Sequence, residues 1–293
     1  MKSIAIRLVL VCLLAFTALS FAVPAFAEDE TLPDPGLTPD SPLYFFDGLA
    51  KKVSLFFTFN DEARASKALR YAEERLAEAR TMAAKNLVRE TARAADDYDR
   101  YMAQVRQRLE NRVVSINLSE RVALAAARHL DILERAGEQV QPEARTALER
   151  AMAASAEGQM DALRALAKDR PEVAIGIIEE NLDRQTEKAV IRLINKATGD
   201  NVTAKTDGVL DYADRLAALE DEMTALAGEN GVDITGIVEK LQQSTSNRLQ
   251  ALNGVCENAP ESARPGIENA IQNSVRKYER SLEKLTSSVN PGP

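Results

Sequence analysis

The sequence predicts an all-α protein, an elongated multi-helix bundle of about eight helices that includes two related helical hairpins. Between Leu49 and Ala136 it contains no glycine and no proline, and Ala, Leu, Glu and Arg dominate. These residues lose little conformational freedom in a helix. Apolar residues recur at steps of three and four, which places them on one helical face. The period-two alternation of a half-buried strand is missing over any useful length.

Apolar stripes and capping residues indicate where individual helices lie. The clearest stripe consists of Val209, Ala213, Leu216, Leu219, Met223 and Leu226. A helix with such a face must bury it against another helix. Asn60 is suited to cap a helix start, and Pro142 and Pro171 fit first turns, where a missing N–H costs nothing. Gly228 is suited to end a helix.

The first 27 residues have the features of a signal peptide. Lys2 and Arg7 give a positive start, and the apolar run from Leu8 to Phe21 is shorter than the roughly 20 residues of a membrane-spanning helix. An Ala-Phe-Ala sequence that ends at Ala27 matches the small-x-small cleavage pattern. We therefore expect export to the periplasm or the extracellular space, with residues 1–27 removed.

Charge and cysteine content narrow the class of the exported chain. Removal of residues 1–27 leaves 35 basic and 45 acidic residues, a net charge of −10. This acidic balance argues against binding nucleic acid and against electrostatic attachment to anionic lipid. Cys256 is then the sole cysteine, so no intramolecular disulfide can form and the fold must rest on packing.

Changes in composition divide the remaining chain into four segments. Residues 28–42 contain four prolines and are expected to form an extended linker. An N-terminal helical domain is predicted at 43–112 and a helical hairpin region at 113–170. A second helical region, which includes the repeat of that hairpin, is predicted at 171–290.

The two hairpins are related by an offset of 119 residues. This shift superposes Leu130 on Leu249, Arg145 on Arg264 and Leu148 on Ile267. Each copy reads as a helix, a proline-containing turn and a second helix, which predicts a duplicated hairpin. Convergent helix boundaries are the alternative explanation.

A short N-terminal stretch resembles a known family. Residues Pro39 to Tyr44 read Pro-x-Ser-Pro-x-Tyr, and Ala72 to Glu78 read Ala-Glu-x-Arg-Leu-x-Glu. Over residues 37–110 or so, the chain resembles a family of exported bacterial and archaeal helical domains known as a domain of unknown function. The resemblance implies secretion and helical structure, and it implies no activity and no site residues.

The most unusual local feature is a cluster of aromatic residues. All phenylalanines beyond the signal peptide lie between Phe45 and Phe59, and Tyr44 adjoins them. On a helix, one face would carry Phe45, Leu49, Val53 and Phe56, and it could enter a membrane or a partner's groove. We favour the other interpretation, in which this face is buried and closes one end of the bundle, because amphipathic helices normally face a core.

His129 is the only histidine and lies on the apolar stripe of its helix. The offset of 119 aligns it with Arg248, and places Glu149 and Glu268 at equivalent positions on the facing helices. We expect His129–Glu149 and Arg248–Glu268 to form structural polar pairs, since a buried polar group needs a partner. One histidine and one cysteine cannot supply a zinc or di-iron site, so no metal, cofactor or catalytic residue is predicted.

These observations favour a non-enzymatic binding or scaffold module of the cell envelope. It would dock a protein partner, or self-associate, through its Ala- and Leu-rich stripes. The alternative is an extracytoplasmic chaperone of the holdase type, or a stress-responsive protein. That alternative predicts a large exposed apolar patch near the phenylalanines, whereas the module predicts that they are buried. Membrane contact is not favoured, and neither nucleic acid nor a small-molecule substrate is expected.

Overall fold

The computed structural model describes residues 32–111, 114–137, 140–196, 202–232, 234–259, 261 and 264–289. The predicted signal peptide, its cleavage site after Ala27 and the start of the predicted linker lie outside these residues. The described part of the linker, residues 32–42, contains no helix.

Within the described residues the chain forms nine helices and no strand, which confirms the all-α prediction. The helices are α2 (Tyr44–Phe56), α3 (Asp61–Ala84), α4 (Val88–Glu110), α5 (Ile116–Gly137), α6 (Pro142–Ala167), α7 (Pro171–Lys196), α8 (Val202–Asn230), α9 (Ile234–Asn258) and α10 (Arg264–Val289).

Local capping explains where several of these helices begin and end. The side chain of Asn60 accepts a hydrogen bond of 2.8 Å from the backbone N–H of Ala63, which confirms the predicted cap of α3. Pro142 and Pro171 are the first residues of α6 and α7, as predicted. Helix α8 continues past Gly228 to Asn230, and the residue that follows, Gly231, has a φ of +64°. The stop predicted at Gly228 is therefore wrong, because the left-handed conformation falls on Gly231.

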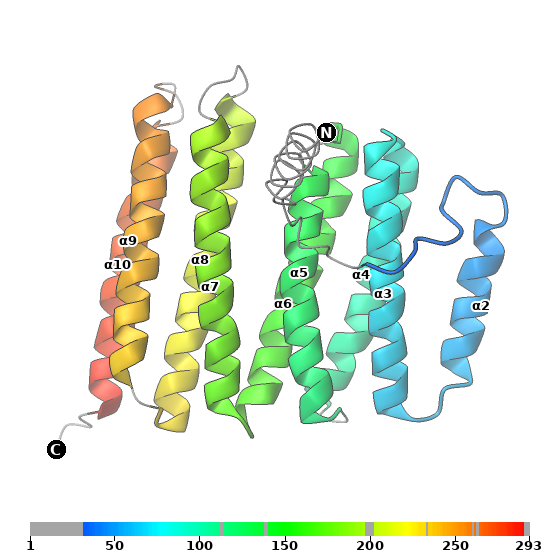
Figure 1. Cartoon of the computed structure of the whole chain (residues 1–293), viewed down its shortest axis with the longest axis horizontal. Coiled ribbons are helices and arrows are strands. Elements are labelled where there is room, and N and C mark those ends of the chain that lie inside the picture. Colours follow the sequence, from blue (N-terminus) through cyan, green and yellow to red (C-terminus); the bar gives the residue numbers. More distant parts are fainter. Residues whose placement is uncertain are drawn as a thin grey trace, which may run out of the picture.

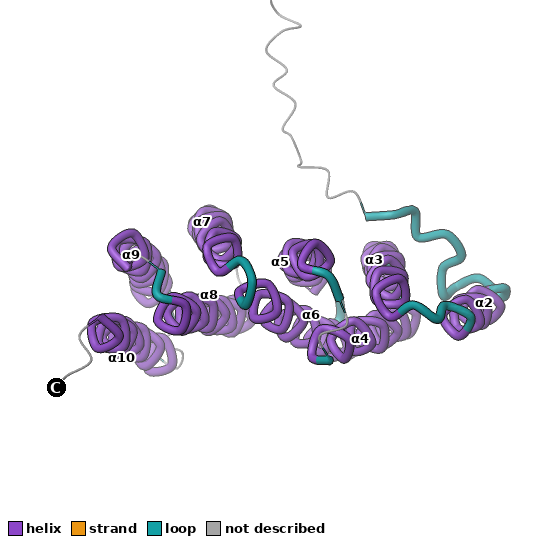
Figure 2. Tube along the Cα trace, turned by 90° about the horizontal axis from the view of Figure 1, so that it is seen from below, coloured by secondary structure: helices purple, strands orange, loops and turns teal. Residues whose placement is uncertain are grey.

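The helices are arranged as antiparallel pairs in two layers (Figure 2). One layer holds α3, α5, α7 and α9, and the other holds α4, α6, α8 and α10. Each helix packs against its hairpin partner and against the next helix of its own layer. Helix α2 lies at one end of the row, beside α3 (Figure 1).

Both predicted hairpins exist as packed pairs, α5–α6 and α9–α10. Adding 119 to the bounds of α5 gives 235–256, close to the observed α9 at Ile234–Asn258. The contacts α3–α5 and α4–α6 correspond to α7–α9 and α8–α10, but the shift of 119 does not superpose α3 on α7, because it gives 180–203 for a helix observed at Pro171–Lys196. The packing is what the repeat predicts, while duplication of an ancestral unit stays a prediction.

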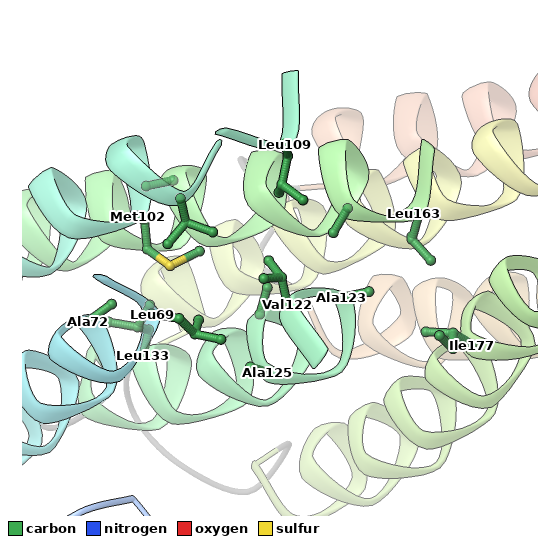
Figure 3. Packing of buried hydrophobic residues seen from close by; sticks show 14 of the residues in the cluster. Leu69, Ala72, Met102, Leu109, Val122, Ala123, Ala125, Leu133, Leu163 and Ile177 are labelled. Carbon is green, nitrogen blue, oxygen red and sulfur yellow. The ribbon is translucent and has the colours of Figure 1, made fainter. Parts of the chain in front are cut away.

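A continuous apolar core runs between the layers, from Leu55 in α2 to Leu285 in α10. Large side chains such as Leu69, Met102 and Leu133 interdigitate with alanines in this core (Figure 3). Four members of the stripe predicted in α8 are part of it, namely Leu216, Leu219, Met223 and Leu226. Ala213 of the same stripe is buried in a smaller cluster with Leu252, Ala259 and Ile267. Intramolecular packing therefore uses the stripes that were expected to dock a partner.

Candidate functional site

Helix α2 turns its apolar side away from the bundle. The exposed apolar residues of this helix and of its two flanks form what we call the aromatic face: Leu43, Phe45, Phe46, Leu49, Val53, Phe56, Phe57 and Phe59. Phe45 is 64% exposed and Phe56 is 71% exposed. Elsewhere in the described chain, the large apolar side chains that are exposed are Leu37 and Val275. The prediction that the phenylalanine cluster is buried is therefore wrong.

The predicted grouping on the helix is nevertheless correct. At 100° per residue, Phe45, Leu49, Val53 and Phe56 share one side. Tyr44, Lys51 and Leu55 share the opposite side, and these three residues are buried. Residue spacing thus identified the two sides of α2 correctly. The side that packs against the bundle, however, is the one that carries most of the polar groups.

A buried arginine on α3 explains this orientation. The side chain of Arg75 is 1% exposed, and its Nη1 donates hydrogen bonds of 2.8 and 2.7 Å to the two carboxylate oxygens of Glu78. Its Nη2 donates to Asp47 Oδ2 of α2 at 2.5 Å. A buried guanidinium requires acceptors, so α2 must present Asp47 to α3.

Two further residues of α2 complete the contact. The hydroxyl of Tyr44 lies 3.0 Å from Glu78 Oε2 and 3.0 Å from Asp97 Oδ2, and the Arg75 guanidinium lies 4.8 Å from the centre of its ring. Lys51 Nζ pairs with Asp47 at 2.5 Å and with Glu74 of α3 at 3.0 Å. We call Tyr44, Asp47, Lys51, Arg75 and Glu78 the α2 anchor.

Burial and pairing compete in the anchor. Burial acts to raise the pKa of Asp47, but hydrogen bonds and charges of Lys51 and Arg75 overcome this effect and lower the pKa. Burial has the larger effect on Glu78 and raises its pKa to about 7, although Arg75 and Tyr44 act in the opposite direction. Burial also raises the pKa of Tyr44, assisted by the charge of Glu78, so its hydroxyl stays protonated and available as a donor. The anchor is a network of mutually paired groups, which suits it to position a helix.

A cavity of about 330 Å³ adjoins α2 on the side of α4. Its walls carry four cationic side chains and one carboxylate, together with apolar atoms that include the ring of Phe56. The charged residues are Lys52, Arg64, Arg100, Arg108 and Asp97. Burial and the nearby charge of Arg64 lower the pKa of Arg108. This is a concentration of positive charge in a chain whose formal net charge is −8.

The structure gives the predicted polar pairs other partners. His129 is buried, and its Nδ1 lies 3.0 Å from the hydroxyl of Tyr98 in α4, whereas Glu149 is exposed. Arg248 is also buried and pairs with Glu220 of α8 at 2.6 Å, whereas Glu268 is exposed.

His129 and Arg248 are thus both buried, as predicted, but the predicted pairs with Glu149 and Glu268 are wrong. In both copies the partner comes from the preceding helix, because that helix faces the buried side chain. The glutamates on the following helix point to solvent.

The residues that sequence reasoning missed are those of α3 and α4. Arg75 and Glu78 belong to the Ala72–Glu78 stretch on which the family resemblance was based. They flank Leu76, which is fully buried. Two opposite charges three residues apart, beside an apolar stripe, were the available signal of a buried ion pair.

The described part of the chain contains neither a cluster of metal ligands nor a helix suited to cross a membrane. No three His, Cys, Asp or Glu side chains there are arranged to hold a metal ion. No helix among the described residues is long and apolar enough to cross a membrane.

Fold and site together define an all-helical domain of stacked helix pairs that carries a terminal helix with an outward aromatic face. The chain belongs to the family described as Domain of unknown function (DUF5667), whose model matches residues 36–290. The match confirms the resemblance seen near residues 37–110 and extends it over all nine helices. No curated protein matches the sequence.

Replacing Arg75 should detach α2 from the bundle. Arg75→Gln leaves Glu78, which is 0% exposed, without its cation, and breaking a buried pair costs about 3–5 kcal/mol. We expect a loss of that order in urea unfolding, together with faster amide hydrogen exchange in α2. The control is Arg106→Gln, which removes a partly exposed pair with Asp161 and should cost about 1 kcal/mol or less. Equal losses for both variants would contradict the assigned role of the anchor.

His129 should make stability depend on pH. Burial lowers its pKa from 6.5 to about 3, so below about pH 6.5 the unfolded chain takes up a proton that the folded chain does not. The free energy of unfolding of the wild type minus that of His129→Gln should therefore decrease by about 1.4 kcal/mol per pH unit between about pH 6 and 4. Glu78 has the opposite effect, since its pKa is raised, but it contributes equally to both proteins. Urea titrations at several pH values test this, and a pH-independent difference would refute it.

Proposed function

We propose that this protein is an exported binding module of the cell envelope that docks to its target through the aromatic face of α2. The observation that carries the proposal is the exposure of eight large apolar side chains on and beside one terminal helix. Contiguous apolar patches are rare on soluble proteins and are typical of interaction sites. The features of a signal peptide in residues 1–27 support the location.

The exposure is not a general failure of packing. Burying a phenylalanine stabilises a fold by about 1.5–3 kcal/mol, so leaving five of them in water is costly. Among the side chains that the structure describes in α3 to α10, which exclude those of residues 185–212, Val275 is the one large apolar residue that is exposed. Large apolar side chains are thus buried in the described parts of the other helices and exposed on α2, which supports a role for α2 in binding rather than in folding.

The α2 anchor makes the face ready to bind. Ion pairs from Asp47 and Lys51 hold the helix on α3, so little conformational freedom is left to lose when a target docks. The packed helices of the two-layer array lie behind it. No catalytic step is part of this proposal.

A holdase is the second candidate, because an exposed apolar patch is what it requires. The two functions differ in their targets: a docking module has one, whereas a holdase captures many unfolded clients. The confinement of the patch to one anchored 13-residue helix favours a single docking surface.

Site-specific photo-crosslinking in cells tests the proposal. A photoreactive amino acid is placed at Phe56, and at Val275 on α10 as a control, in a chain tagged at its C-terminus. We expect adducts in the envelope fraction from Phe56 and not from Val275, and loss of these adducts when Phe45 and Phe46 are both changed to Ser. One dominant adduct supports the module, whereas a broad ladder of clients supports the holdase. Equal labelling from the two positions would contradict both.

A further inference from the structure

The aromatic face and the cationic cavity are parts of one surface. Phe56 belongs to the face and also lines the cavity, and Lys52 of α2 lies at the boundary between them. We propose that this surface docks on an anionic phospholipid bilayer, with the aromatic side chains among the acyl chains and a lipid phosphate in the cavity. The inference rests on the proposed function and names the target of the same site.

The cavity has more positive charge than its own carboxylate can neutralise. Asp97 is already engaged by Arg100 at 2.6 Å and by the hydroxyl of Tyr44 at 3.0 Å. Arg108 donates from Nη1 to the backbone carbonyl of Gln104 at 2.7 Å, but its buried Nε makes no hydrogen bond and lies 3.8 Å from the carboxylate of Asp61. A lipid phosphate would give this guanidinium a charged acceptor closer than Asp61.

The aromatic face has the composition of a helix that lies in a membrane interface. None of its eight members is charged, and the five within α2 lie away from the anchored side of the helix, while Leu43, Phe57 and Phe59 flank it. A helix of 13 residues is about 20 Å long, which allows several phenylalanines to enter the lipid together. Interfacial binding combines such an apolar area with attraction of nearby cations to anionic lipid.

The acidic charge of the whole chain does not oppose this. Exposed charges further apart than about 8–10 Å are largely screened at physiological ionic strength. The cations of the cavity adjoin the face itself, whereas α2 carries its carboxylate, Asp47, on the anchored side. The net charge of the chain, which argued against binding to anionic lipid, is negative, but the charge next to the aromatic face is positive.

A second copy of the chain fits the face less well than a bilayer does. Aromatic side chains bury about 150–250 Å² each, so five exposed phenylalanines supply an area similar to the roughly 800 Å² per partner of stable protein interfaces, and charge rather than area distinguishes the two targets. A symmetric dimer through α2 would bring two cationic cavities toward each other. A bilayer surface requires no reciprocal patch, and its phosphates match the cations.

The absence of tryptophan from the sequence allows a direct test. In the full chain, Phe56→Trp places a single fluorophore on the face, and Val275→Trp places one on α10 as a control. With vesicles of phosphatidylglycerol and phosphatidylcholine in equal parts, emission from the first variant should shift to the blue and be quenched by brominated acyl chains. The second variant should not respond, and vesicles of phosphatidylcholine alone should give much weaker binding.

The role of the cavity is tested in the Phe56→Trp background. Arg100→Gln with Arg108→Gln should weaken binding to the mixed vesicles roughly thirtyfold, since each cation near an anionic surface contributes about fivefold. Arg276→Gln with Arg280→Gln removes the same charge from exposed positions on α10 and should have no effect.

Three results would overturn the inference: no response to vesicles, equal binding to both lipid compositions, or a blue shift that depends on protein concentration without lipid. The last would assign the face to a second copy. A protein adduct from the photoreactive probe, with no vesicle response, would refute the lipid target alone. If neither a photo-crosslinked adduct nor a response to vesicles is found, the docking function is refuted as well.

Discussion

The contact between Arg75 and helix α2 determines what this protein presents to its surroundings. A guanidinium that is 1% exposed must be surrounded by acceptors, and its own helix supplies only Glu78. The remaining acceptor is Asp47, which α2 can supply only by facing α3 with its polar side. The phenylalanines on the other side of the helix are therefore turned to solvent by the geometry of an ion pair.

The other helices provide the setting for this arrangement. Alanines at the helix contacts, such as Ala68, Ala72 and Ala95, are fully buried and allow neighbouring helices to approach closely. Repeated pairs then form two layers with a continuous core between them (Figure 2). Because that core uses the apolar surfaces of α3 to α10, the apolar surface of α2 remains as the main exposed one.

Much of this could be predicted from the sequence, and the failures have definite physical causes. Helix type, the cap at Asn60 and the grouping of Phe45 with Phe56 follow from local propensity and periodicity. Periodicity assigns residues to a side of a helix, but it does not say which side meets the bundle. The default that apolar sides face inward failed because the decisive partner, Arg75, lies on another helix.

The polar pairs show the same limit. The predicted repeat aligned His129 with Arg248, and both side chains are buried. Their partners, Tyr98 and Glu220, lie on α4 and α8. These helices are outside the two aligned hairpins, so the alignment could not show where they pack. The cationic cavity was missed for a similar reason, since its side chains come from three helices.

The outward orientation of the aromatic face is the central claim, and carbene footprinting of the purified, dilute monomer tests it most directly. Mass spectrometry would measure labelling at single side chains. The structure predicts strong labelling of Phe45, Phe56 and Phe57, and protection of Tyr44 and Tyr98. Protected phenylalanines in the monomer would contradict the account, because they would place the apolar side of α2 against the bundle.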